Sequence, residues 1–249
     1  MSAKTAILLV VAVFALTLLI RLPAGVLAWL LPHSVACESP GGTLWRGGCA
    51  EVRSGTLALA DVRWRLHPLS LLRAQAALDV DSNDPRARGN GHLTLHLNGD
   101  VDIATLNLSL PLEGGLVPAP AGWTGLLDLG IDRASVRGGH IVAVQGTLTA
   151  RALHMDQSNV DLGSFELKFP TAPVGDAPVD DAPMIGTVRD LGGPLMLAGQ
   201  LQLRRDGNYE LDGTIAARDA SSADLQQVLN LLGPPDAAGR HAVSFAGTY

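Results

Sequence analysis

The chain has 249 residues, is 47% hydrophobic and 17% charged, and carries a formal net charge of −6. That hydrophobicity excludes intrinsic disorder, and the acidic balance excludes nucleic acid as a partner, because phosphates would be repelled. The negative charge lies beyond residue 31, since residues 1–31 carry Lys4, Arg21 and no acidic side chain.

An apolar segment opens the chain. Residues 6–31 contain one charged side chain, Arg21, and are long enough to cross a bilayer core of about 30 Å if Arg21 reaches an interface. We therefore expect a short cytoplasmic tail at 1–5, a single transmembrane anchor at 6–31, and the remainder outside the cytoplasm. Two alternatives stay open: a signal peptide cleaved after residues 34–36, and lipid attachment at Cys37.

Two cysteines follow the apolar segment. Cys37 and Cys49 flank a glycine-rich stretch, and in an exported domain such a pair is more often bridged than free. A disulfide closing a loop of this size contributes on the order of 3 kcal/mol. The alternative is a pair of unpaired, small hydrophobic side chains. No histidine lies at metal-ligand spacing from them, so we expect a disulfide and no metal site.

The rest of the chain is dominated by alternating apolar and polar residues, which indicate half-buried strands. Because each strand carries one polar face, the pattern favours an antiparallel sheet. An Asp-Gly pair at 206–207 marks a hairpin between two of the strands. The alternating segments lie at 92–98, 106–110, 127–131, 165–169, 201–203, 209–215 and 243–245.

One segment has helical periodicity. Within 221–232, leucines and a valine recur at i, i+3, i+4 and i+7, with a capping-box start and a Gly-Pro-Pro stop. A shorter helical turn is expected after Pro68. The predicted fold is thus a mainly β, antiparallel domain, a curved sheet or a groove-like one, with one or two short α-helices behind a single transmembrane helix.

A Pro- and Asp-rich loop at 170–186 divides the domain in sequence. It separates a β-rich block at 32–169 from a second block at 187–249, which contains the helix at 221–232. The pattern leaves open whether the two blocks form one continuous sheet.

The residues that could carry chemistry do not form a recognisable site. His92 and His96 would lie about 13 Å apart on a strand, too far to share an ion. Asp79, Asp81 and Asn83 imitate the start of a calcium loop, but its glycine and glutamate positions are not filled. We therefore expect no catalytic, cofactor-binding or metal-binding residues, and a protein that is not an enzyme.

Two tryptophans lie among arginines. Trp45 precedes Arg46, and Trp64 lies between Arg63 and Arg65. One interpretation makes the tryptophans core anchors, with the arginines in solvent on the other side of the strand. The other makes these five residues a partner interface, because Trp and Arg dominate binding hot spots.

Several segments resemble the protein N family of bacterial type II secretion systems. No single motif is diagnostic, but their order and spacing along the chain are fairly specific. The matching segments are 42–47 (GTLWRG), 63–69 (RWRLHPL), 110–112 (LPL), 122–123 (GW), 197–204 (LAGQLQLR), 207–209 (GNY), 232–236 (LGPPD) and 239–240 (GR).

The resemblance implies a function. It implies a non-catalytic accessory component, anchored in the inner membrane with its β-rich domain in the periplasm, in the machine that exports folded proteins across the outer membrane. Its partners would be the inner-membrane platform proteins and the outer-membrane secretin. A competing hypothesis is an anchored periplasmic groove that binds or shuttles lipid, like the AsmA-like bridge proteins, since leucines on one face of many strands could form a concave apolar surface.

Overall fold

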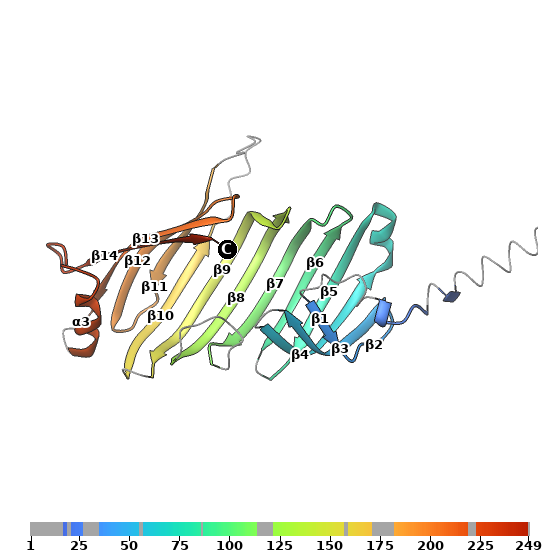
Figure 1. The fold of residues 1–249 in the computed structure, drawn as a ribbon, viewed down its shortest axis with the longest axis horizontal. Coiled ribbons are helices and arrows are strands. Elements are labelled where there is room, and N and C mark those ends of the chain that lie inside the picture. Colours follow the sequence, from blue (N-terminus) through green and yellow to red (C-terminus); the bar gives the residue numbers. More distant parts are fainter. Residues whose placement is uncertain are drawn as a thin grey trace, which may run out of the picture.

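The computed structural model describes residues 17–18, 21–26, 35–54, 57–85, 87–113, 122–156, 159–170, 182–218 and 223–248. One 14-stranded antiparallel sheet runs through it, and from β3 onward each strand pairs with the next along the chain (Figure 1). The mainly β, antiparallel fold expected from the alternation is confirmed. The elements are β1 (Val35–Glu38), β2 (Gly41–Gly42), β3 (Arg46–Ser54), β4 (Leu57–His67), the 3₁₀ helix η1 (Pro68–Arg73), β5 (Gln75–Asn83), β6 (Arg88–His96), β7 (Val101–Pro111), β8 (Trp123–Arg137), β9 (His140–Met155), β10 (Val160–Phe169), β11 (Met184–Asp190), β12 (Leu195–Leu203), β13 (Asn208–Ala217), α3 (Ala223–Asn230) and β14 (His241–Thr248).

The sheet has two chemically different faces. Residues paired across an antiparallel ladder share a face, so register defines an inner face that carries Trp64, Leu78 and Leu93, and an outer face that carries Arg65 and Asp79. The inner face continues through apolar pairs across β7, β8, β9 and β10. Those pairs are Leu106 with Ile131, Leu108 with Leu129, Leu129 with Leu148, and Leu148 with Leu167.

The sheet continues across the Pro- and Asp-rich loop. Phe165, Glu166, Leu167 and Lys168 of β10 pair with residues 187–190 of β11, so the two blocks separated in sequence belong to one sheet. Within that loop, residues 171–181 lie outside the described residues.

One end of the inner face is covered by α3, which lies at the β14 end of the sheet in Figure 1. Leu225, which is 1% exposed, and Leu229 pack in one cluster with Leu162 and Leu195. The helix is shorter than the predicted segment 221–232, and Ser221 lies outside the described residues. The turn expected after Pro68 is present as η1.

The expected membrane anchor at 6–31 falls largely outside the described residues. None of the described helices is both long and apolar enough to cross a bilayer. The described part of this segment nevertheless contacts the folded domain. Leu44 donates its backbone N–H to the Leu22 carbonyl at 2.8 Å, Ala24 donates to Gly42 at 3.1 Å, and Ala24 is 2% exposed.

Candidate interaction surface

The two tryptophan–arginine segments fold into one unit. Trp64 of β4 lies opposite Gly47 of β3, and its indole Nε1 donates a hydrogen bond to the Leu44 carbonyl at 3.1 Å. A Cβ atom on residue 47 would lie 2.5 Å from the Trp64 ring. Glycine at 47 therefore leaves the space that the indole fills, and Trp64 is 6% exposed.

A disulfide closes the same unit. Cys37 and Cys49 are bridged, with their Cα atoms 5.6 Å apart, which joins β1 to β3. Cys49 packs in a buried cluster with Trp64 and Ala24, and Leu78 lies against that cluster. The bridge therefore ties the short edge strand β1 to the apolar side of the sheet.

The arginines lie on the opposite face. Arg46 is paired in register with Arg65 across β3 and β4, and the Arg63 guanidinium contacts the Asp61 carboxylate at 3.2 Å. All three arginines are exposed, whereas Trp64 is buried on the inner face. The structure thus brings Arg46, Arg63 and Arg65 together on the outer face, with Trp64 behind them.

Trp45 lies beside this group. It is half-buried, and its carbonyl accepts a hydrogen bond from the Leu66 backbone N–H at 2.9 Å. Its backbone therefore joins the start of β3 to β4, next to the arginines.

A polar hollow of about 960 Å³ lies on this outer face. Arg46, Arg63 and Arg65 line it together with Asp79, Asp81 and His92. We call these six residues and the space they surround the polar hollow.

A histidine–aspartate cluster borders the polar hollow. The two carboxylate oxygens of Asp79 lie 2.7 Å from His67 Nε2 and 2.6 Å from His92 Nδ1. The hydrogen bond with His92 lowers the pKa of the Asp79 carboxyl, and the hydrogen bond with His67 adds to this effect. Burial opposes both. One ligand atom from each of the three lies within 4.8 Å of the others, a donor set compatible with Zn²⁺.

Sequence reasoning missed this cluster. His67, Asp79 and His92 come from β4, β5 and β6, so only strand register brings them together. The sequence analysis considered His92 together with His96. In the structure, His96 instead contacts the carboxylate of Asp102 at 2.7 Å.

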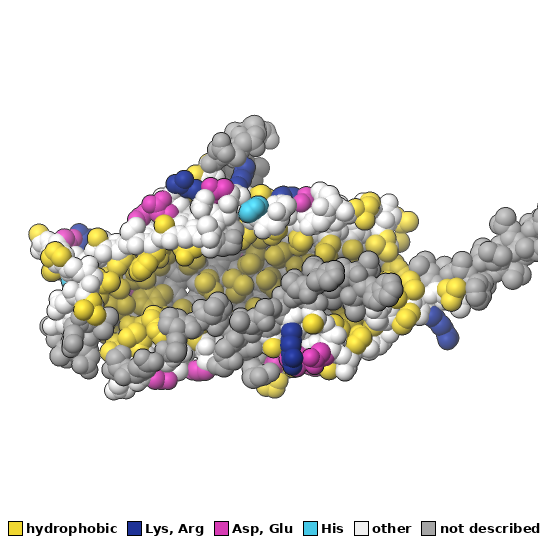
Figure 2. Space-filling model, in the orientation of Figure 1, with side chains coloured by type: hydrophobic (Ala, Val, Ile, Leu, Met, Phe, Trp, Pro, Cys, Tyr) yellow, Lys and Arg dark blue, Asp and Glu magenta, His cyan; other side chains and the backbone are white. Residues whose placement is uncertain are grey.

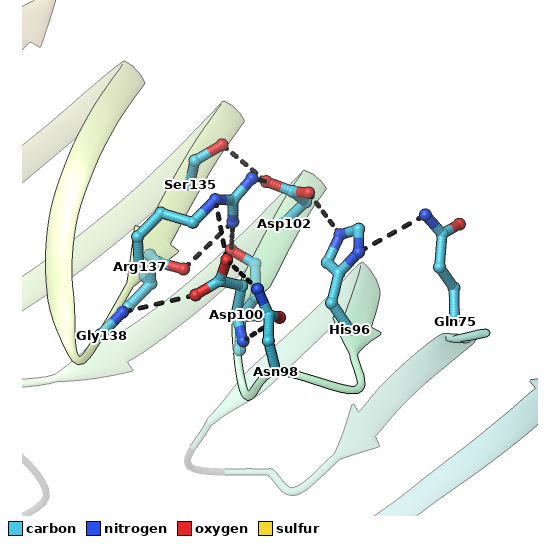
Figure 3. A network of polar contacts seen from close by, with 10 residues as sticks. Gln75, His96, Asn98, Asp100, Asp102, Ser135, Arg137 and Gly138 are labelled. Atoms are coloured by element: carbon cyan, nitrogen blue, oxygen red, sulfur yellow. Dashed lines mark hydrogen bonds and ion pairs between the residues drawn. The ribbon is translucent and has the colours of Figure 1, made fainter.

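Asp102 is the centre of a second polar network (Figure 3). It accepts hydrogen bonds from Ser135 Oγ at 2.7 Å and from Arg137 Nη2 at 2.6 Å, and it contacts His96 Nε2. These contacts lower the pKa of Asp102 to about 2, and the hydrogen bond from Ser135 has the largest effect. Gln75 Nε2 lies 3.4 Å from His96 Nδ1, so the network joins β5, β6, β7 and β8 on the outer face.

A comparison with known protein families identifies the family of this chain. The family model described as type II secretion system (T2SS), protein N, matches residues 33–244. The chain belongs to the protein N family of type II secretion systems. The match covers the whole sheet up to β14, including the disulfide, the arginines and the polar hollow.

Individual members of the protein N family match over nearly their full length. The type II secretion system protein N of Aeromonas hydrophila is 26% identical over 241 residues, which is 92% of this chain and 92% of that protein. The protein N of Vibrio cholerae serotype O1 is 26% identical over 245 residues, covering 93% and 92%. That of Klebsiella pneumoniae is 27% identical over 248 residues, covering 94% and 91%. No solved structure matches the chain.

Family membership makes the chain a component of the type II secretion system. The first two matching segments of the sequence, 42–47 and 63–69, are the ones that pack on each other through Trp64 and Gly47. Their contact explains why a glycine and a tryptophan occur at those two places.

Proposed function

We propose that this protein is a non-catalytic accessory component of the type II secretion system, anchored in the inner membrane with its sheet in the periplasm. Family membership supports a place in the machine. The Cys37–Cys49 bridge supports an oxidising compartment such as the periplasm. The apolar segment 6–31 supports the anchor, with residues 22–24 held against the fold.

We further propose that the outer face around the arginines binds other machine components, the inner-membrane platform proteins and the outer-membrane secretin. Arg46 and Arg65 face each other across β3 and β4. Asp79 lies opposite Arg65 on the other side, across β4 and β5, but its carboxylate oxygens contact His67 and His92. Within the described part of the chain neither guanidinium forms an ion pair. Like charges directly opposite one another destabilise a sheet. An acidic partner surface would relieve that repulsion, and this is the observation that carries the proposal.

Within this surface the roles differ. Arg46, Arg63 and Arg65 are exposed and would contact the partner, with Trp45 at the margin. Trp64 would act from behind by holding β3 against β4, since its indole is buried. The polar hollow, which these arginines line, would give the partner a concave binding surface.

Affinity capture of the full-length protein from detergent-extracted membranes tests this surface. Two double variants have the same charge change: Arg46→Ala with Arg65→Ala, and the control Arg88→Ala with Arg133→Ala. The control arginines are exposed and lie on β6 and β8, without an ion pair to the described residues. Loss of two hot-spot arginines should lower recovery of platform proteins and secretin by about tenfold or more, and the control should match wild type. Equal recovery with both double variants would overturn the proposed surface.

Location is tested separately by treating spheroplasts with protease. The proposal predicts that the protein stays in the membrane pellet after alkaline extraction and that the sheet is digested from the periplasmic side. Protection of the sheet until the inner membrane is broken would contradict the orientation, and release into the soluble fraction would contradict the anchor.

A further inference from the structure

The inner face of the sheet is an apolar surface that the described residues only partly cover. Figure 2 shows hydrophobic side chains gathered along a hollow that runs across the strands. On it, Leu95 of β6 remains 42% exposed and Phe245 of β14 remains 56% exposed. Most of the leucines between them are half-buried. A continuous apolar surface of this kind on a protein marks a binding site.

Charge is nearly absent from this surface. On the strands from β5 to β13 the described inner positions are Ala, Val, Leu, Ile, Met, Phe, Trp, Tyr, Gly and Ser, with Asp190 as the one charged side chain. In the turn between β5 and β6, Asp84 is 1% exposed and its carboxylate accepts a hydrogen bond from the Ala60 N–H at 2.9 Å. Asp190 is ion-paired with Arg218 at the α3 end. The Ser82 hydroxyl donates to the Ala87 carbonyl at 3.0 Å. The occupant must therefore be uncharged where it contacts this face.

The same lack of polar groups argues against an extended peptide as the occupant. Backbone N–H and C=O groups that leave water need hydrogen-bond partners. The side chains on the inner face offer almost none. An acyl chain has no such groups and is matched by a wall of leucines and valines.

A buried apolar cluster lies at each end of the hollow. At one end α3 closes it, because Leu225 and Leu229 pack onto Leu162 and Leu195. At the other end Ala24, which is 2% exposed, packs in a buried cluster with Cys49 and Trp64, and Leu78 lies against that cluster. Ala24 belongs to the apolar segment 6–31, so the hollow begins where the segment expected to lie in the membrane joins the fold.

The dimensions suit a membrane lipid. Strands lie about 4.8 Å apart, so the nine strands from β5 to β13 span about 40 Å. One leaflet of the bilayer core is about 15 Å thick, which is the extent of its acyl chains. The hollow is therefore long enough to hold such chains lengthwise.

We propose that the inner face is a trough that binds the acyl chains of inner-membrane phospholipids, with its membrane-proximal end where residues 22–24 join the fold. This goes beyond the proposed partner binding, which uses the opposite face. The two are separable, because lipid contact and capture of machine components are measured independently.

Photo-cross-linking in vesicles tests the trough. The full-length protein is reconstituted into vesicles of phosphatidylethanolamine and phosphatidylglycerol that contain a phosphatidylethanolamine with a diazirine in its acyl chain. After illumination, adducts are mapped by mass spectrometry of peptides. The proposal predicts adducts on inner-face residues of β6 to β10, such as Leu108, Leu129 and Leu148. Adducts confined to residues 1–31 would overturn it, as would cross-linked dimers in place of lipid adducts.

Variants sharpen this test. Leu129→Asp places a charge in the middle of the inner face, whereas Asn107→Asp places one on the outer face of the neighbouring strand. We expect Leu129→Asp to lower the adduct yield in β6 to β10 at least fivefold, and Asn107→Asp to leave it unchanged.

A second inner-face variant guards against misfolding of Leu129→Asp. Gly91→Phe fills the trough without charge, and a Cβ at this position would lie 3.1 Å from the movable end of Leu106. It should also lower the yield, and its thermal unfolding temperature is measured to establish that the variant is folded. An unchanged yield in a folded Gly91→Phe protein would overturn the proposal.

Discussion

Replacing Trp64 by alanine should destabilise the sheet severely. The indole is 6% exposed and packs with Cys49 and Ala24, and truncating a buried Trp to Ala costs about 4 kcal/mol through lost burial and the cavity left behind. The Leu44 carbonyl also loses its hydrogen-bond donor, the Trp64 indole N–H 3.1 Å away. This loss costs about 1 kcal/mol and is already included in the value for the whole side chain. Trp64→Phe keeps most of the burial and should cost about 1–2 kcal/mol.

The assay is equilibrium urea unfolding of the full-length protein in mild detergent, followed by circular dichroism. Arg65→Ala, the neighbouring residue on the exposed face, is the matched control and should change the free energy of unfolding by no more than about 0.5 kcal/mol. If Trp64→Ala costs less than about 1 kcal/mol, the indole does not anchor β3 to β4 and the reasoning fails. Comparing the unfolding free energies of Trp64→Ala and Arg65→Ala also shows whether a variant that captures less partner has lost its fold or only a contact.

Three further predictions concern other parts of the fold. Replacing Cys37 and Cys49 together by serine should lower the free energy of unfolding by about 3 kcal/mol and abolish any effect of reductant on the urea midpoint; a wild-type midpoint insensitive to reductant would refute this. Because the pKa of Asp102 is lowered to about 2 in the fold, its stabilisation is complete above the unfolded pKa of about 3.9. That contribution disappears as the pH falls toward 2, so Asp102→Asn should flatten the fall of Tm between about pH 5 and pH 2, and parallel curves would count against the network. Leu229→Ala should cost about 2–5 kcal/mol and increase proteolysis between β13 and β14; unchanged proteolysis would mean that α3 is not held by this contact.

Much of the sheet was predictable from the sequence, because alternation reports a local property of each strand. The hairpin expected at Asp206 and Gly207 joins β12 to β13, with Arg204 donating its backbone N–H to Asn208 at 2.8 Å. The leucines at 106, 108 and 110 lie on one face, as the alternation predicts. One strand ends earlier than predicted. β6 stops at His96 because Asn98 and Asp100 form a turn through their side chains and Gly99 has φ +86.

What depends on register was not predictable. The cluster of His67, Asp79 and His92 requires the alignment of three strands. A register shift between His92 and Leu93 moves the pairing of β6 by an amount that no local pattern encodes. Continuity of the sheet across residues 170–186 likewise rests on the pairing of β10 with β11. For the same reason the sequence left two interpretations of Trp64 open, and the close approach of its ring to Gly47 shows where its side chain lies.

The most direct test of the account is a secretion assay in cells that lack this protein. Export of a type II substrate into the medium is compared for the wild-type chain, for Arg46→Ala with Arg65→Ala, and for the control Arg88→Ala with Arg133→Ala, all at equal abundance. We predict that the wild-type chain and the control restore export, and that the Arg46 and Arg65 variant restores at most about a tenth of it. Equal export by all three, or normal export in cells without the protein, would contradict a role in the machine through this surface.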